Sequence, residues 1–483
     1  MISLRGFSVQ FVGFSLMGLF LLGGISLSEE IPSFYREPDS YGTRRDPDPP
    51  RYVRAGAELF PEAGQFLNGI DLGLDYRFRY EYRRNDLRRN QLGLDQPLLH
   101  RTRLYFGVRN RLDPFRFALE LTDSRRFNSD YPLDHRDWNQ MELTQLYGGL
   151  FFPSVFGREV EFRYGRMNFE FLDRRLLANN QWRNTPNTFD GFRGRVGKER
   201  DRWQLDLLAV QPNLRLLQAK DEPVEGQRIY GLIGHWRGWP DGVTLEPYYL
   251  MLHQKNTEPT ATQPQAQESR QVHSWALRTY GVIPGTSWDY DVDGVYQYGL
   301  QKNGREQTFA TGLTSELGYS FRHAWKPRLS AFYGYASGDR DPTDRSNQRF
   351  ERFYGFGRPW SASDYIVWEN VRTPKLRLEI QPGDRVRLDM GHGFYWLASA
   401  KDRATNFRST GGSLETAAQD GSGGSGDFLG QEFDVRSRHQ LNSHTELTVG
   451  YSHFFTGEFS SAVGKRDSDF LYFELVLNAF GTK

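Results

Sequence analysis

Arginine is the residue type in this chain whose number and spacing most clearly suggest chemistry. The sequence holds 61 Lys and Arg residues, and 52 of them are Arg. A guanidinium group is a planar fork that can bind a carboxylate through two hydrogen bonds, whereas a lysine ammonium acts as a point charge. Arg77 and Arg79 flank Phe78, and this alternation of arginine with apolar residues recurs along the chain. The pattern favours recognition of carboxylates, with a lineage bias toward arginine as the open alternative.

The candidate anion-binding residues occupy the polar positions of these alternating segments, and carboxylates lie among the arginines. If these positions line the water-filled lumen of a channel, mixed fixed charges attract an anion and still bind it weakly enough that it can move on. The alternative, favoured for any single residue, is that arginine–carboxylate pairs merely fill and stiffen the lumen. Arg125, which begins a long connection, is a further candidate. The candidates from alternation are Arg77, Arg79, Arg101, Arg103, Arg193, Arg377, Arg387, Asp434, Arg436 and Arg438.

Composition excludes several classes of protein. The formal charge is +1, which argues against a nucleic-acid partner. Hydrophobic residues make up 38% and mean hydropathy is −0.67, so a bundle of membrane-spanning helices is excluded. The absence of cysteine removes disulfides, thiol nucleophiles and thiolate zinc sites. A polar chain with 15% aromatic residues is too aromatic for disorder and is typical of outer-membrane β-barrels.

The elements that must position the arginines are strands. From 70 to 82, apolar residues share one parity and charged residues the other, which gives a strand with one apolar and one charged face. Such a segment is longer than the ~5–6 residues of most strands and matches the ~9–11 of a tilted membrane strand. We therefore predict an all-β fold, a transmembrane antiparallel barrel of about 18 strands. The predicted strands cover 70–82, 99–111, 115–122, 142–151, 159–167, 189–197, 202–210, 227–236, 243–251, 271–282, 287–299, 307–321, 327–337, 371–381, 384–397, 429–441, 443–456 and 468–480.

The connections between these strands alternate in length. Those after even-numbered strands are mostly tight, such as 112–114 and 284–286. Those after odd-numbered strands are mostly long, such as 122–140 and 168–188. A barrel with short periplasmic turns and long extracellular loops produces this alternation.

The N-terminal part of the chain has a different character. Residues 1–28 are predicted to be a secretory signal peptide, because an uncharged run over 7–25 precedes small residues; a retained anchor is the alternative. Residues 29–69, rich in proline and charge at their centre, are expected to form a flexible periplasmic segment. The barrel is assigned to 70–483. The expected location is the outer membrane of a Gram-negative bacterium.

Three groups of residues carry a family resemblance. They are Tyr164-Gly165-Arg166 with Trp182-Arg183-Asn184 and 188–191, then 335–339 with Trp368-Glu369-Asn370, then 429–434 with 450–454 and Gly457. Their order and spacing resemble the alginate export family. The resemblance implies an eighteen-stranded monomeric barrel with an electropositive lumen that conducts a polyuronate. It also implies that the segment 166–195 folds toward the pore, which adds Arg166, Arg174, Arg183 and Asp190 to the pore-facing candidates.

The leading hypothesis is a passive outer-membrane channel for an anionic, alginate-like polysaccharide. It is not an enzyme on this interpretation, and it needs no cofactor and no metal. The segment 338–344 resembles a calcium loop but lacks the glutamate and spacing of a helix–loop–helix site. The expected partners of the protein are the polysaccharide, outer-membrane lipid and a periplasmic protein that delivers the polymer.

Three alternatives remain open from the sequence. One is an uptake porin for small anionic nutrients, because the residues do not distinguish export from uptake. Another is an outer-membrane enzyme, for which His273, His392 and His439 are candidate strand histidines without an accompanying nucleophile motif. The last is a structural or adhesive barrel with a plugged lumen.

Overall fold

The computed structural model describes residues 47–62, 67–89, 91–198, 201–237, 242–408 and 417–482. The predicted signal peptide lies outside these ranges. Among the described residues, no helix is both long enough and apolar enough to cross a membrane.

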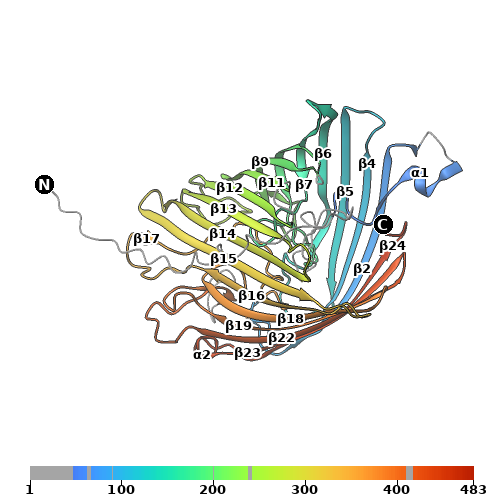
Figure 1. Ribbon diagram of the computed structural model, residues 1–483. Coiled ribbons are helices and arrows are strands. Elements are labelled where there is room, and N and C mark those ends of the chain that lie inside the picture. The colour runs from blue at the N-terminus through green and yellow to red at the C-terminus, as the bar shows by residue number, and fades with distance from the viewer. Residues whose placement is uncertain are drawn as a thin grey trace.

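A closed antiparallel barrel of eighteen strands forms the body of the described chain (Figure 1). It closes because the last strand pairs with the first, with Asp75 opposite Asn478 and Arg84 opposite Asp469. The predicted eighteen-stranded antiparallel barrel is confirmed. Its strands are β2 (Ile70–Arg84), β4 (Leu98–Val108), β5 (Phe115–Phe127), β6 (Asn139–Val155), β7 (Arg158–Met167), β8 (Phe189–Val196), β9 (Trp203–Leu214), β11 (Gln227–Trp236), β12 (Thr244–Gln254), β13 (Arg270–Val282), β14 (Trp288–Gln301), β15 (Glu306–Ser320), β16 (Arg328–Ala336), β18 (Val371–Gly383), β19 (Val386–Trp396), β22 (Phe428–Asn442), β23 (Thr445–Thr456) and β24 (Ser468–Asn478).

β5 is one of the strands that run further than predicted. It was expected to end at 122 but continues to Phe127, where it still pairs with Leu98 of β4. Asp123 and Arg125 occupy the outward positions of this extension and pair with each other. The strand continues beyond the part of its outward face that is apolar. The apolar alternation of the sequence therefore ends before the strand does.

Short elements accompany the barrel. They are β1 (Val53–Ala55), β3 (Leu94–Asp95), β10 (Glu222–Pro223), β17 (Ser346–Asn347), β20 (Ala404–Arg408), β21 (Ala417–Ala418), α1 (Gly56–Leu59) and α2 (Glu458–Ala462). β1 pairs with the first residues of β2, next to the point where β24 ends.

The two faces of the barrel wall differ in the way that the alternation predicts. Outward residues such as Trp275 and Leu313 are 56% and 39% exposed. Most charged strand residues point inward and are buried, and Arg79 and Arg278 have 2% and 0% exposure; inward apolar residues such as Ile229 lie among them. A wall with apolar side chains outside and ionised side chains inside suits a surrounding of lipid, because exposed apolar area is unfavourable in water.

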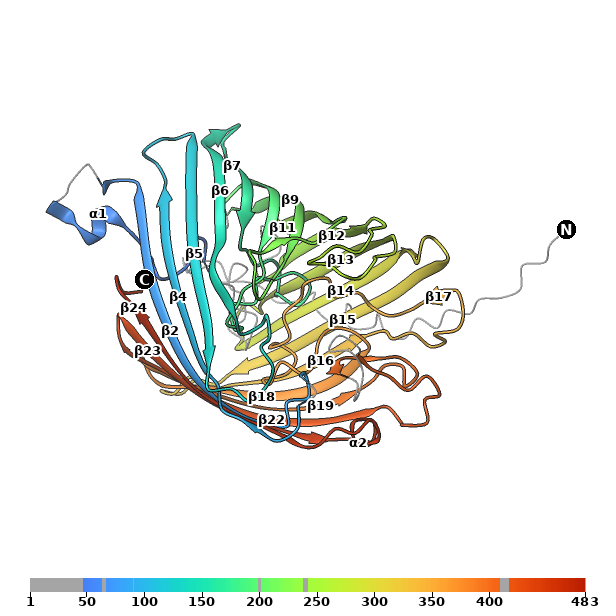
Figure 2. The same ribbon diagram turned by 180° about the vertical axis from the view of Figure 1, so that it is seen from behind.

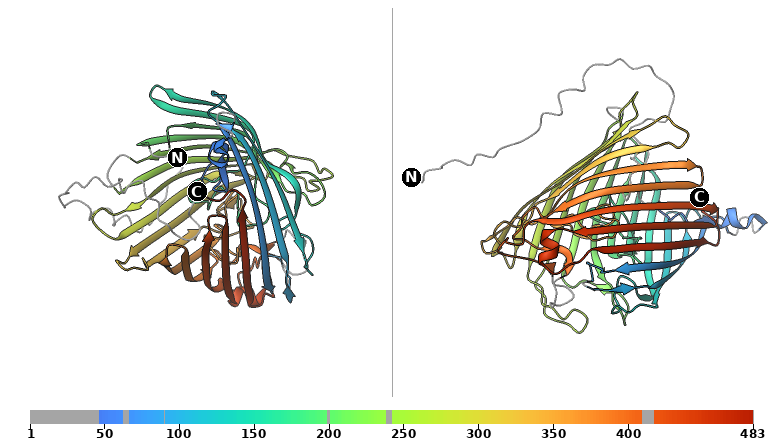
Figure 3. Two further views of the ribbon diagram at one scale, coloured as in Figure 1. Left: turned by 90° about the vertical axis from the view of Figure 1, so that its right-hand side faces the viewer. Right: turned by 90° about the horizontal axis from the view of Figure 1, so that it is seen from below.

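The barrel has two distinct ends. We call one the turn end, because connections there are short, as at 156–157, 384–385 and 443–444. The other is the loop end, which carries the long connections 168–188 and 337–370. Figure 3 shows α1 and the C-terminal end of the chain together at the turn end.

Much of the apolar core belongs to loops inside the barrel. Leu177, Phe350, Trp360 and Trp368 each have 0% exposure. Trp360 and Trp368 pack with ring centroids 5.9 Å apart, and Phe350 packs against Trp368 at 4.8 Å. Loop segments are seen between the strands in Figure 2. The loops 168–188 and 337–370 thus form an apolar nucleus surrounded by the polar inner wall.

Candidate pore constriction

Two inward loops meet at the centre of the barrel. The backbone N–H of Ala178 donates to the carbonyl of Tyr354 at 3.2 Å, and that of Tyr354 donates to the carbonyl of Leu176 at 3.2 Å. The N–H of Phe356 donates to the carbonyl of Arg174 at 2.9 Å. Backbone groups of one loop therefore satisfy those of the other, as buried backbone requires. We call this pair of loops, 168–188 and 337–370, the constriction.

Arginines of the inner wall hold loop 168–188 in place. Arg77 donates to the carbonyls of Gln181 at 3.1 Å and Arg183 at 2.9 Å. Arg79 donates to the carbonyl of Trp182 at 2.9 Å. Arg101 also reaches the Gln181 carbonyl, at 3.0 Å. In this state these arginines position a loop through its backbone.

Arg103 belongs to the same part of the wall but has a different partner. Its Nε donates to Asp75 at 2.8 Å, while Nη1 reaches the side-chain oxygen of Gln181 at 3.1 Å. The guanidinium also lies over the ring of Tyr52, 4.3 Å from its centroid.

Asp364 joins three loops through one carboxylate. It is fully buried and accepts hydrogen bonds from Arg88 at 2.5 Å and from Arg183 at 3.0 Å. Burial acts to raise the pKa of Asp364, but Arg183 and Arg88 outweigh it and lower the pKa to about 2. The carboxylate is therefore ionised at neutral pH and holds the constriction to the connection 85–97.

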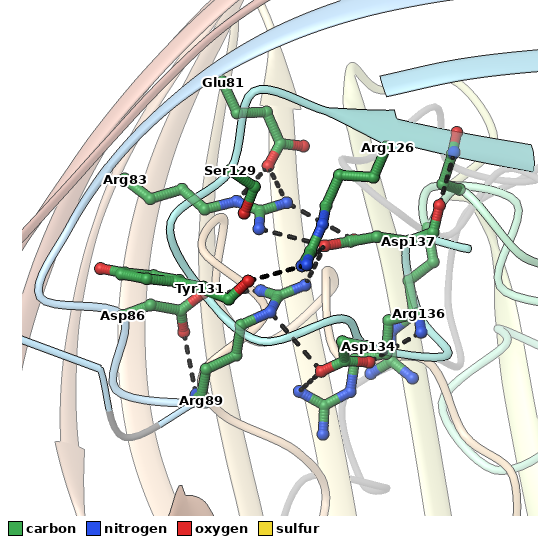
Figure 4. Close-up of polar contacts among 12 residues, drawn as sticks. Glu81, Arg83, Asp86, Arg89, Arg126, Ser129, Tyr131, Asp134, Arg136 and Asp137 are labelled. Atoms are coloured by element: carbon green, nitrogen blue, oxygen red, sulfur yellow. Dashed lines mark hydrogen bonds and ion pairs between the residues drawn. The ribbon is translucent and has the colours of Figure 1, made fainter. Parts of the chain in front are cut away.

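A second network ties the connections 85–97 and 128–138 together at the loop end (Figure 4). Asp137 accepts from Arg83 at 3.1 Å, from Arg89 at 2.8 Å and from Arg126 at 3.4 Å. Burial raises the pKa of Asp137, but Arg83 and Arg89 lower it well below its ordinary value. Networks of buried ion pairs fix geometry, because removing one member leaves an uncompensated charge.

The inner wall toward the turn end carries a ladder of charge pairs. Arg377 of β18 donates to Asp389 of β19 at 3.0 Å and to Asp434 of β22 at 2.9 Å. Arg436 of β22 donates to Asp389 at 3.0 Å. Arg438, two residues along the same inward face, opposes Arg387 of β19 in the register of the sheet. The strip presents guanidinium groups and carboxylates in alternation.

A recess lies between this ladder and the constriction. It is narrow, with a cavity volume of about 20 Å3. Lys375 is held at its edge by the carbonyls of Pro359 at 3.2 Å and Trp360 at 2.8 Å. Its lining is Arg175, Glu316, Ser330, Phe332, Pro359, Lys375 and Arg377. Three cationic side chains and one carboxylate therefore line the recess, and Arg175 and Arg377 also pair with carboxylates outside it.

The structure places most sequence candidates on the inner wall or in the constriction. Arg174 lies over the ring of Phe356, 5.0 Å from its centroid, and Arg183 pairs with Asp364. Arg193 faces the interior, where it donates to Asp206 at 3.2 Å. The candidates with inward positions on strands are Arg77, Arg79, Arg101, Arg103, Arg193, Arg377, Arg387, Asp434, Arg436 and Arg438.

Three candidates differ from the expectation that they face the pore. Arg125 has outward parity, opposite His100, and it is Arg126 that points inward. Arg166 and Asp190 share the parity of the outward residue Tyr164 and bind each other at 2.8 Å. They form a clamp at the rim, because strand parity continues through the motif that suggested them.

The sequence reasoning also missed several inward residues. Arg83 and Arg126 could have been found, because each shares parity with inward charged residues of its own strand. Arg88, Arg175 and Asp364 lie in loops, where no periodicity reveals the direction of a side chain. Lys375 has the inward parity of Arg377, so strand alternation identifies it as well.

The histidines considered for an enzyme lie apart from one another on the wall. His273 stacks on Tyr298 with centroids 4.8 Å apart, and His392 meets Gln431 at 3.0 Å. His439 meets Ser437 at 2.6 Å. In the part of the chain that the structure describes, no group of three or more His, Asp or Glu residues is placed to hold a metal ion.

Comparisons with known proteins agree on the type of barrel. The family described as alginate export matches residues 69–473. OccAB1 of Acinetobacter baumannii has a TM-score of 0.57 at 11% identity, covering 84% of this chain and 96% of that chain. OccD3 (OpdP) of Pseudomonas aeruginosa has a TM-score of 0.54 at 14% identity, covering 85% of this chain and 91% of that chain. The outer membrane protein OprD from Pseudomonas aeruginosa has a TM-score of 0.54 at 10% identity, covering 85% of this chain and 93% of that chain. These structures share the fold, and no curated protein matches the sequence significantly.

Proposed function

Because the chain belongs to the alginate export family, a family of the Gram-negative outer membrane, we propose that it is a passive channel for an anionic polysaccharide. The polysaccharide is a polyuronate of the alginate type. No cofactor takes part, and the direction of transport comes from synthesis of the polymer on one side.

The observation that carries this proposal is the run of guanidinium groups and carboxylates along the inner wall. Arg377, Asp389 and Arg436 are joined through one shared carboxylate. A uronate carboxylate can replace a wall carboxylate on a guanidinium group, because that planar fork can bind either carboxylate through charge-assisted hydrogen bonds. Weak exchange of this kind at several sites permits movement along the wall.

The two ends of the barrel receive different roles in this proposal. The turn end faces the periplasm and the loop end faces outward, as in other outer-membrane barrels. The polymer then meets the charge ladder and the recess lined by Arg175, Lys375 and Arg377 before it reaches the constriction. Displacement of the loops 168–188 and 337–370 opens the way outward.

Planar-bilayer recording tests the proposal. The purified chain is expected to form anion-preferring channels in a KCl gradient, and polymannuronate is expected to block them reversibly. A neutral dextran of matched length is the control for steric block. Cation preference, or equal block by dextran, would count against the proposal.

A second candidate function is the uptake of small anionic nutrients. The packed apolar nucleus of the constriction favours it, because Trp360 and Trp368 are fully buried and pack against each other inside the barrel. A length series separates the two functions. If block lifetimes rise with the number of uronate units, a polymer channel is supported; if only the monomer permeates and longer oligomers have no effect, the uptake function is supported.

A further inference from the structure

The N-terminal segment 47–53 crosses the inside of the barrel at its turn end. Tyr52 is 3% exposed, and its hydroxyl donates to Glu120 of β5 at 2.5 Å. A Cβ at Gly73 of β2 would lie 2.8 Å from the Tyr52 ring, so glycine is needed for this close approach. Val53 begins β1, which pairs with β2. We call the segment 47–53 the strap, anchored at Tyr52.

The N-terminal part of the strap places a carboxylate on two wall arginines. Arg163 of β7 donates to Asp48 at 2.6 Å, and Arg193 of β8 reaches the same oxygen at 3.4 Å. The Asp48 side chain is 36% exposed, so it stays accessible to solvent. Burial acts to raise the pKa of Asp48, but Arg163, Arg193 and Arg195 lower it to about 2.

The charges of the wall around Asp48 do not cancel without it. Arg195 pairs with Glu161 at 3.0 Å, and Glu161 also accepts from Arg163 at 3.0 Å. Arg193 pairs with Asp206 at 3.2 Å. Three guanidinium groups therefore share two wall carboxylates, and Asp48 supplies the third negative charge. When Asp48 leaves, a site for one anionic oxygen group is exposed.

We propose that Arg163, Arg193 and Arg195 form an anion site for a uronate carboxylate, and that Asp48 of the strap occupies it as an internal competitor. The inference rests on the proposed function for the chemical class of the ligand. An arriving carboxylate displaces Asp48 while Tyr52 keeps the strap attached. The strap thereby covers the anion site at the turn end until a uronate carboxylate takes the place of Asp48.

The test uses the full mature chain in planar bilayers with glucuronate, a single uronate, as the probe. Asp48→Asn removes the competing charge and keeps the size of the side chain. Its apparent Kd for block by glucuronate is expected to fall about fivefold, which matches the loss of one partly exposed ion pair. Glu58→Gln is the matched control, because Glu58 lies just after the strap in α1, is 46% exposed and pairs with Arg54 at 3.1 Å.

Each outcome of this test is decisive. Tighter block in Asp48→Asn but not in Glu58→Gln, abolished by adding Arg193→Gln, supports the internal competitor. Equal block in the wild type and Asp48→Asn overturns it, even where polymannuronate still blocks the channel. Absence of polymannuronate block in a chain that shows the Asp48 effect overturns the proposed function instead. Migration of the unheated barrel in detergent gels verifies that each variant has folded.

Discussion

Replacing Asp364 with asparagine tests whether charge holds the constriction closed. The fully buried carboxylate accepts from Arg88 at 2.5 Å and from Arg183 at 3.0 Å. Its pKa is lowered from 3.8 to about 2. This difference corresponds to ~2.5 kcal/mol in favour of the ionised form when the loops are in place. Because the pKa is lowered in the closed state, this stabilisation is complete above the ordinary pKa and is lost as the pH falls toward 2.

The expected result of Asp364→Asn is a shift of the closed-to-open equilibrium toward the open state by roughly sixtyfold, from the same free energy. Single-channel recording at pH 7 measures it as the fraction of time spent at high conductance. The wild type is expected to approach this behaviour when the pH is lowered from 4 to 2. Both changes have one cause, the loss of the negative charge between Arg88 and Arg183.

Asp341→Asn is the matched control for this experiment. Asp341 lies in the same loop, is exposed, and accepts from the hydroxyl of Thr343 at 2.6 Å. It is expected to leave the recordings unchanged. The reasoning is refuted if Asp364→Asn has the same open fraction as Asp341→Asn, because the loops would then be held by apolar packing alone.

Three further predictions address the wall. Arg126→Gln is expected to reduce anion preference and raise current noise, because Arg126 joins the inward network at Asp137. Arg125→Gln, on the outward face, is expected to change neither. Reversal potentials in a KCl gradient distinguish the two variants. Arg377→Gln leaves Asp389 and Asp434 uncompensated and is expected to raise cation permeability, with Arg372→Gln, whose side chain is 46% exposed, as the unaffected control. Gly334→Ala places a Cβ 2.3 Å from the Trp360 ring and is expected to destabilise the constriction by about 1–3 kcal/mol. Thermal unfolding in detergent should show a lower Tm for this variant than for Gly294→Ala, whose Cβ meets no atom within 4 Å.

The strands could be predicted because each one is a local pattern. β14 was expected over 287–299 and is found over Trp288–Gln301, with aromatic residues outward and Asp291 and Asp293 inward. A period of two requires only that one face meets lipid and the other meets polar groups. Closure itself is the pairing of β24 with β2, which an even number of antiparallel strands permits.

The path of the loops could not be predicted because it depends on contacts between distant residues. Arg77 lies 106 positions from Arg183, whose carbonyl it binds. Nothing local in 168–188 specifies that its backbone will meet a wall arginine. The motif around Arg166 led to a wrong prediction, because Arg166 and Asp190 bind each other at the rim instead of facing the pore. Strand parity was the better guide there, and it also identifies Arg126.

The structural and the transport interpretations of the wall arginines describe the same contacts in two states. An isolated inward guanidinium would hold a polyuronate too tightly for it to move, since each released carboxylate would leave a buried, unpaired charge. A guanidinium that already has a wall carboxylate, as Arg377 has Asp389 and Asp434, lets the polymer go without that penalty. Asp48 of the strap gives Arg163 a carboxylate partner in the same way. Under the proposed function, this pairing of wall charges is therefore also the condition for an anionic polymer to pass.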